Sequence, residues 1–344
     1  MIELKNDTLT ISFPHVHPRA RLRISFQRTL RIPDDGRDYP LPPSIGAFPL
    51  KHVDDFAQRV SPRWLERGGI MLPMFQAEAM WLDFGSDRIP RHGASYPFAI
   101  KIAAGTINAA SGEDWREGLH RGPQDYVVAP KQPWLDGYCV EKGFIRQFVA
   151  MPLGSGYSAE EQLTGKAQHG GVQIAVYPMK RDVFERRFPK LPPMPARRRA
   201  MTPPMPCAAP MAAAPDMGLA AGGRMRQEIY DDPFELADWD TSVRSRCFVH
   251  LCNSLVWPSL TGAPPPHPPP TAEQYTRARL PWFEYYAEGT AIQGSERLAG
   301  VKSVVQLGFE KGGNPLPENV SVTPDNIVQI RAGLKPGQVR EGDF

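Results

Sequence analysis

The N-terminal part of the chain alternates between apolar and polar side chains. Every second residue is apolar from Leu9 to Phe13, and the same alternation resumes after Pro14, from Ala20 to Phe26. Successive side chains of a β-strand point to opposite faces, so a period of two residues is typical of a strand with one buried face. We therefore expect two half-buried strands near the N-terminus.

Further short apolar segments follow along the chain, separated by turn residues such as Gly, Pro, Asn and Asp. Helical periodicity is limited to residues 52–67, interrupted by Pro62, and to residues near 295–308, while 74–84 fits either a helix or a buried strand. With so few helices, the pattern predicts a β-rich α+β fold with an antiparallel β-sandwich-like N-terminal domain. Strands are expected at 97–103, 125–129, 144–151, 172–177, 246–252 and 326–331.

Residues 189–223 differ in composition from the rest of the chain. They are dense in Pro, Ala and Met and poor in aromatic residues, so they offer too little apolar surface to offset the entropy of ordering. We interpret them as a linker or arm that could wrap a neighbouring molecule. The predicted organisation is a larger β-rich, sandwich-like domain at 1–188 and a smaller α+β domain at 224–344.

The composition is ordinary for a globular protein, except for its proline content. Of 344 residues, 41% are hydrophobic and 22% are charged, but 38 are proline, against a usual share of about 5%. The net charge of +3 is small and does not favour a nucleic-acid partner. Apolar runs are too short for a membrane span, and the first residues lack the layout of an export signal. We therefore expect a soluble, cytoplasmic protein with no membrane partner.

Residues 151–180, MPLGSGYSAEEQLTGKAQHGGVQIAVYPMK, contain elements of a nucleotide site. A Walker loop requires a glycine five residues before its Gly-Lys pair and a Ser or Thr after it, but Glu160 and Ala167 occupy these positions. Ser158 and Glu161 have the spacing of a capping box, and acidic residues at a helix N-terminus would repel a phosphate. We interpret the stretch as a turn, a capped helix, a second turn and a strand.

His15 and His17 form an H-x-H pair. On a strand this spacing places both rings on one face, as metal ligands require. The spacing identifies no third ligand, and both rings could instead lie at the rim of the buried face of a sheet. A divalent metal at His15 and His17 is therefore one hypothesis, beside the expectation that the protein has no cofactor.

Cysteine and carboxylate side chains are the other candidates for chemistry. Cys247 and Cys252 lie in a predicted strand, where buried cysteines more often fill apolar space than react. Three carboxylates are close to aromatic residues in the sequence, namely Asp83, Asp125 and Asp136. Apolar surroundings raise the pKa of a carboxyl group, as a general acid requires. A turn role for Asp136 and a strand-end role for Asp125 explain these positions equally well.

Seven tryptophans occur mostly beside Pro, Gly or acidic residues, in loop-like settings. Exposed aromatic rings on a β scaffold can stack on sugars or anchor a protein interface, although rings that cover a core beneath a loop are more common. Alternating arginines project from one predicted strand, where they could bind an acidic partner or form a solvated face. The candidate binding residues are Trp81, Trp115, Trp134, Trp282, Arg19, Arg21 and Arg23.

Four long sequence segments resemble a known family. They are LHRGPQDYVVAPKQPWLDGYCVEKGFIRQFVAMPLG, HGGVQIAVYPMK, GGRMRQEIYDDPFELADWD and TAEQYTRARLPWFEYY. In these phrases the chain resembles a family of bacterial proteins to which no function is assigned, over about residues 30–310. The resemblance implies no fold, activity or ligand.

None of the common catalytic motifs identifies a reaction for this protein. The sequence contains no G-x-S-x-G, H-E-x-x-H or dinucleotide fingerprint. We therefore expect a non-catalytic binding or self-assembly protein, whose aromatic, proline-rich loops contact a protein partner or a second copy of the chain. The alternatives are a metal- or carboxylate-dependent hydrolase acting on a polar substrate, and a carbohydrate-binding protein.

Overall fold

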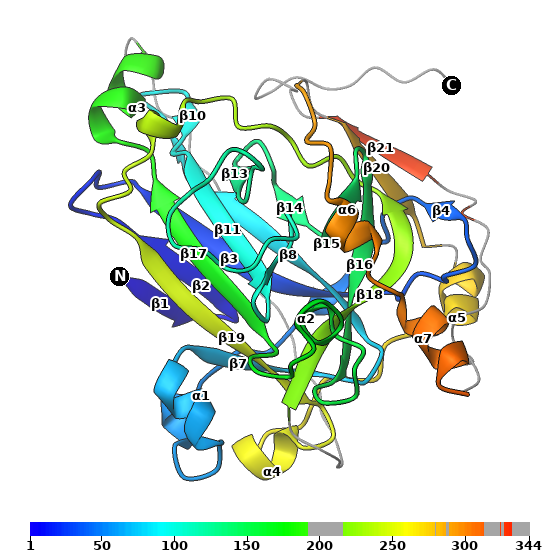
Figure 1. Cartoon of the computed structure of the whole chain (residues 1–344). Helices are drawn as coiled ribbons and strands as arrows, with labels where there is room; N and C mark the ends of the chain where they lie inside the picture. The colour runs from blue at the N-terminus through cyan, green and yellow to red at the C-terminus, as the bar shows by residue number, and fades with distance from the viewer. Residues whose placement is uncertain (192–215, 279, 287–288, 313–323, 325–326, 332–344) are drawn as a thin grey trace.

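The computed structural model describes residues 1–191, 216–278, 280–286, 289–312, 324 and 327–331, and it is strand-rich with short helices (Figure 1). This confirms the β-rich fold predicted from the period of two. One large sheet of 17 strands is accompanied by two sheets of 2 strands each. The large sheet contains β1 (Ile2–Lys5), β2 (Thr8–Ser12), β3 (Arg21–Thr29), β4 (Asp38–Tyr39), β5 (Ser44–Ala47), β6 (Lys51–His52), β7 (Ile70–Met74), β8 (Ala79–Ser86), β11 (Phe98–Ala104), β12 (Ile107–Asn108), β13 (Val127–Ala129), β14 (Trp134–Leu135), β15 (Gly137–Glu141), β16 (Phe144–Pro152), β17 (Val172–Pro178), β18 (Asp216–Arg226) and β19 (Ser245–Asn253). The small sheets pair β9 (Arg88–Ile89) with β10 (Ala94–Ser95), and β20 (Trp282–Tyr286) with β21 (Ile327–Arg331).

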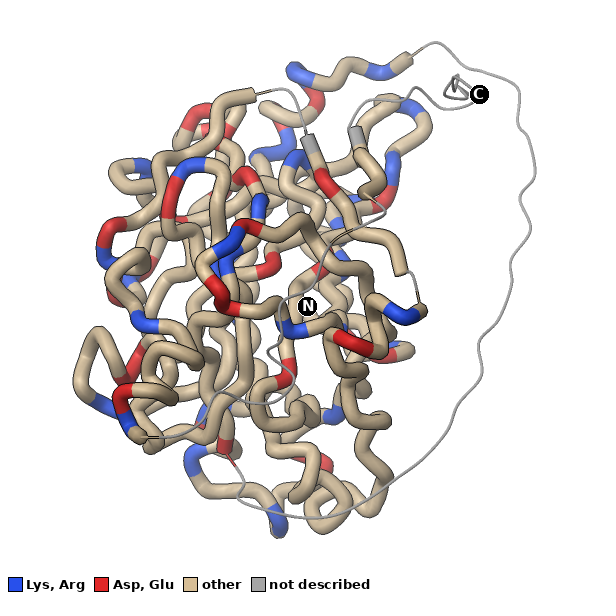
Figure 2. The backbone as a smooth tube through the Cα atoms, turned by 90° about the vertical axis from the view of Figure 1, so that its right-hand side faces the viewer, with Lys and Arg blue, Asp and Glu red and all other residues tan. Residues whose placement is uncertain are grey.

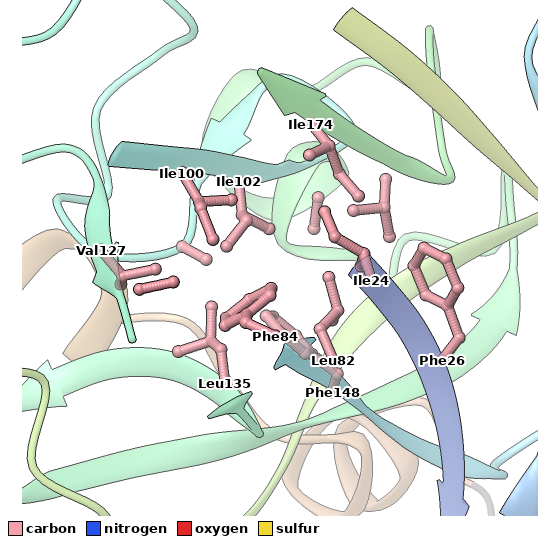
Figure 3. Close-up of a cluster of buried hydrophobic side chains, with 14 of the residues drawn as sticks. Ile24, Phe26, Leu82, Phe84, Ile100, Ile102, Val127, Leu135, Phe148 and Ile174 are labelled. Carbon is pink, nitrogen blue, oxygen red and sulfur yellow. The ribbon is translucent and has the colours of Figure 1, made fainter. Parts of the chain in front are cut away.

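The large sheet folds over on itself around a shared core. Strands β2, β3 and β8 connect by hydrogen bonds through β16 and β18 to β19, β17 and β11. Ile24 and Phe84 from the first group point toward Ile100 and Ile174 from the second (Figure 3). The ladder is continuous between the two groups, whereas a sandwich consists of two separate sheets that pack face to face.

Most neighbouring strands of the large sheet are antiparallel, but two of its pairs are parallel, as is the pair of β20 and β21. Strand β19 lies parallel to β7, and β18 lies parallel to β4. The alternation predicted for β3 is observed, because Ile24 and Phe26 are 0% exposed while Ser25 between them reaches the outer face. The period of two therefore predicts correctly which side of β3 faces the core.

Strand β18 begins inside the arm predicted at 189–223, so the predicted end of the arm is wrong. Its pairing with β16 and β19 also carries the sheet across the predicted boundary between the two domains. A Cβ atom at Gly223 would lie 2.5 Å from the backbone oxygen of Pro33, so the strand needs glycine to pack this closely. Residues 192–215 of the predicted arm lie outside the described residues.

The helices are short and lie outside the sheet (Figure 1). Pro62 begins a helix instead of interrupting one, as its fixed φ and missing N–H permit at a first helical position. No helix within the described ranges has the length and apolar character needed to cross a membrane. The helices are η1 (Asp54–Phe56), α1 (Pro62–Arg67), α2 (Ala159–Thr164), α3 (Arg181–Arg187), η2 (Leu236–Asp238), α4 (Trp257–Thr261), α5 (Ala272–Arg277), α6 (Glu296–Ala299) and α7 (Val304–Glu310).

The glycine turn before α2 is occupied by a carboxylate of the protein itself. Glu161 Oε1 accepts hydrogen bonds from the backbone N–H groups of Gly154 at 2.8 Å and Gly156 at 2.9 Å. Ser158 and Glu161 form the predicted capping box. A phosphate would have to displace this carboxylate from the amides that it uses, which supports the interpretation of the stretch as a structural connection.

Candidate ligand pocket

The outer face of β3, β8 and β14 carries polar and aromatic side chains. The antiparallel register places Gln27 opposite Trp81, and it places both Ser25 and Trp134 opposite Asp83 on either side of β8. Directly opposite residues share one face of a sheet, with Cβ atoms about 4.5–5.5 Å apart. The register therefore brings two of the predicted tryptophans and one of the predicted carboxylates onto one surface.

Hydrogen bonds link the polar residues of this surface into a row. Ser44 Oγ donates to Gln27 Oε1 at 2.7 Å, and Gln27 Nε2 donates to Ser25 Oγ at 2.9 Å. Ser25 Oγ in turn donates to Asp83 Oδ2 at 3.4 Å. Burial raises the pKa of Asp83, while the Ser25 hydrogen bond and the charge of Arg23 act in the opposite direction.

A proline segment and β20 complete a pocket at one end of this surface. Leu41 and Phe283 exchange backbone N–H to C=O hydrogen bonds of 2.8 and 2.7 Å, which fix β20 against residues 41–44. The pocket has a volume of about 210 Å³, below the roughly 300–1,000 Å³ of sites for drug-sized ligands. It therefore has room for a compact group only. Its walls include Pro42, Pro43, Trp81, Trp134, Asp136 and Phe283.

The two tryptophan rings meet edge to face in this wall. Their centroids are 6.2 Å apart with an interplanar angle of 65°. Trp134 also packs against Tyr285, with a centroid distance of 4.7 Å. Both tryptophans are half-buried. Packing thus fixes two large aromatic rings at an angle to one another, while leaving part of each accessible.

Asp136 is a buried carboxyl group at the edge of the pocket. It is 2% exposed, and Gln227 Nε2 donates a hydrogen bond of 2.7 Å to its Oδ2. Its own backbone N–H donates to Gln227 Oε1 at 3.1 Å. Burial raises the pKa of Asp136 to about 7, and the hydrogen bond from Gln227 offsets only part of this effect. Within the described residues, no ion pair involves this carboxylate.

Two predicted tryptophans lie elsewhere. The Trp115 ring has the Lys101 ammonium 5.3 Å and the Arg246 guanidinium 5.5 Å from its centroid. Trp282 is 3% exposed and packs against Tyr39 and Tyr275. Trp282 is therefore a core residue, which is the alternative to a binding role.

The predicted arginines do not form one row on β3. Arg19 lies in the turn before the strand, Arg21 is exposed, and Arg23 pairs with Asp87 beside the polar row. Figure 2 shows basic and acidic residues interspersed along the described chain. The arginines on β3 fit the solvated strand face better than a binding surface for an acidic partner.

The two predicted metal ligands do not share a face of a strand. Strand β2 ends at Ser12, before Pro14, so His15 and His17 lie in the following turn, with His15 exposed and His17 buried. The His17 ring stacks on Tyr96 at 5.2 Å. Burial, followed by the nearby charge of Arg181, lowers the pKa of His17. In the part of the chain that the structure describes, no three His, Cys, Asp or Glu side chains form a metal-ligand cluster.

Asp125 is paired within the fold. It accepts hydrogen bonds from Lys101 Nζ at 2.6 Å and from His120, whose Nδ1 lies 2.8 Å away. The pair is buried, with side-chain exposures of 1% for Lys101 and 2% for Asp125. Asp125 thus fixes the 116–125 loop, which gives it a structural role.

The described cysteines are buried and protonated at neutral pH. Burial raises the pKa of Cys139, Cys247 and Cys252 to about 12. Cys207 lies outside the described residues. For Cys247 and Cys252, the expectation that a buried thiol fills apolar space agrees with their positions in the core.

A larger cavity of about 540 Å³ lies between residues 75–78 and 268–274. Its acidic residue, Glu78, already pairs with Arg28, whose Nε lies 2.6 Å from Glu78 Oε1. Glu78 also accepts a hydrogen bond from the backbone N–H of Phe75 at 2.8 Å. This carboxylate has a charged partner inside the fold, which Asp136 lacks among the described residues.

Sequence reasoning selected neither Phe283, which lines the pocket, nor Gln227, which holds Asp136. Both lie far from Trp81 along the chain, and the only available signal was that Phe283 is next to the selected Trp282 in LPWFEYY. No family model, curated protein or solved structure matches this chain.

Proposed function

We propose that the protein is a non-catalytic binding protein and that the pocket between Trp81 and Trp134 is its ligand site. The main support is that two half-buried tryptophans converge with a buried carboxyl group on a pocket of about 210 Å³. Pockets lined mostly by aromatic and apolar groups, with few polar groups, are the usual form of a ligand site. The proline segment fits this proposal because prolines hold a wall rigid.

The test is a binding screen that depends on the two rings. Saturation-transfer NMR would compare quaternary ammonium compounds, monosaccharides and small aromatic acids with wild-type protein and with Trp81→Ala and Trp134→Ala. Trp115→Ala is the matched control, since Trp115 does not line the pocket. We expect at least one compound to lose its signal in both pocket variants and keep it in the control. A screen with no such compound would count against the proposal.

The row of polar side chains beside Trp81 favours a carbohydrate as the ligand. Ser25, Gln27 and Asp83 offer hydrogen-bonding groups beside Trp81, and sugars combine stacking on aromatic rings with hydrogen bonds to such groups. A monosaccharide that requires Gln27, tested with Gln27→Ala, would identify this ligand class.

Self-association is a second candidate. Ile327 and Val328 on β21 are 45% and 39% exposed, and strands with exposed apolar residues at the edge of a sheet can pair with another chain. Light scattering after size-exclusion chromatography should show an oligomer that Ile327→Lys weakens. A monomer at all concentrations would exclude this candidate. The metal-dependent hydrolase remains a prediction that metal analysis of the purified protein can test.

A further inference from the structure

We propose that the pocket binds a quaternary ammonium group, with Trp81 and Trp134 as its aromatic walls and Asp136 as its counter-ion. This inference rests on the proposed function, because it names the ligand class of the same pocket. It follows from three features of the pocket, namely its charge, its walls and its size.

Asp136 has no positively charged partner among the described residues. Asp136 is 2% exposed, and the described hydrogen bond of its carboxyl group comes from the side-chain amide of Gln227. A buried ionised carboxylate is costly unless a positive charge balances it. The described part of the chain balances Asp125 with Lys101 and Glu78 with Arg28 in this way. At Asp136, a bound cation would supply the corresponding charge.

The walls favour a methylated cation over a bare ammonium or a metal ion. The electron-rich face of a tryptophan attracts a cation within about 6 Å, and aromatic walls are the usual surroundings of quaternary ammonium groups in proteins. A primary ammonium has three N–H groups that need acceptors, but most of the pocket wall is apolar. A quaternary ammonium has no N–H group, so its methyl groups can contact Trp81, Trp134 and Phe283 without leaving a donor unsatisfied.

The size of the pocket fits a compact cation. A volume of about 210 Å³ is below that of the usual drug-sized site, so the pocket suits a trimethylammonium group with a short substituent. Choline is the natural probe. Its uncharged analogue 3,3-dimethylbutan-1-ol has nearly the same shape, with carbon in place of nitrogen, and therefore isolates the contribution of the charge.

The test is isothermal titration calorimetry of full-length protein at pH 8 with choline, 3,3-dimethylbutan-1-ol and glucose. We expect choline to bind and the uncharged analogue to bind at least about tenfold more weakly. Asp136→Asn, whose fold is checked by circular dichroism, should remove most of this preference, because it keeps the shape of the side chain and removes its charge. Trp115→Phe should leave both affinities unchanged.

The outcomes separate this inference from the proposed function. Equal binding of choline and its analogue, or a preference that survives Asp136→Asn, would overturn the inference. Binding of glucose without choline, lost in Trp81→Ala, would also overturn it but would support the proposed function as carbohydrate binding. If the wider screen shows no ligand that depends on Trp81 and Trp134, both proposals fail.

Discussion

Replacing Asp136 with Asn should change how the stability of the protein depends on pH. The pKa of Asp136 rises from an ordinary value of 3.8 to about 7 in the folded protein because the group is buried. This difference corresponds to roughly 4 kcal/mol of proton-linked free energy. Because the folded-state pKa is raised, the contribution to stability is fully present below about pH 4 and is lost as the pH rises through 7.

The expected magnitude follows from these two pKa values. Between pH 5 and pH 8, the contribution of Asp136 to the free energy of unfolding should fall by roughly 3 kcal/mol. Asn keeps the shape of the side chain and can accept the hydrogen bond from Gln227, but it does not titrate. The variant should therefore gain stability relative to wild type by this amount as the pH is raised from 5 to 8.

Urea unfolding followed by circular dichroism at the two pH values measures this difference. Other groups that titrate around the pocket, such as Asp83 on β8 and Tyr285 on β20, are present in both proteins, so the comparison largely removes their contributions. If the stability of wild type and that of Asp136→Asn change by the same amount between pH 5 and pH 8, the pKa of Asp136 is not raised. The carboxyl group would then be either accessible to water or paired with a positive charge.

Three further predictions test the structural assignments by urea unfolding. Asp125→Asn should destabilise the protein by about 3–5 kcal/mol at neutral pH, because it leaves the buried Lys101 ammonium without a balancing negative charge. A change no larger than that of an ordinary surface substitution would refute the importance of this pair. Glu161→Ala should lower the free energy of unfolding by about 1–2 kcal/mol, since it removes the carboxylate that accepts hydrogen bonds from the glycine turn and the helix cap. The control, Glu185→Gln at an exposed ion pair, should have no measurable effect. Gly223→Ala should cost about 1–3 kcal/mol, because the new Cβ would meet a backbone oxygen at 2.5 Å; Gly308→Ala has open space around the new atom and should be neutral or stabilising by up to about 1 kcal/mol.

Alternation along the sequence predicted the strands and their inward faces well where the strands are half-buried. In β3, the same alternation that buries Ile24 places Ser25 and Gln27 on the outer face, where they form part of the polar row. Strand β18 escaped prediction because its glycines, Gly222 and Gly223, are required by close packing and lower the apparent preference for a strand. Local composition cannot distinguish such a strand from a flexible segment.

The pocket could be predicted only in part. The setting of Trp81 and Trp134 beside acidic and proline residues indicated binding, but the same signal also selected Trp282, which is in the core. What separates them is the strand pairing of β8 with β14, which joins residues about fifty positions apart. Phe283 reaches the pocket through its backbone pairing with Leu41. Such long-range pairings have no local signature in a single sequence.

The most direct test of the ligand site is ¹⁹F NMR of protein in which its seven tryptophans carry 5-fluoro labels. Single Trp→Phe variants would assign each resonance, and choline would then be added at pH 8. We predict that the resonances of Trp81 and Trp134 shift in a saturable way while that of Trp115 does not move. Resonances that remain unchanged at Trp81 and Trp134, or a shift confined to Trp115 or Trp282, would contradict the assignment of this pocket as the binding site.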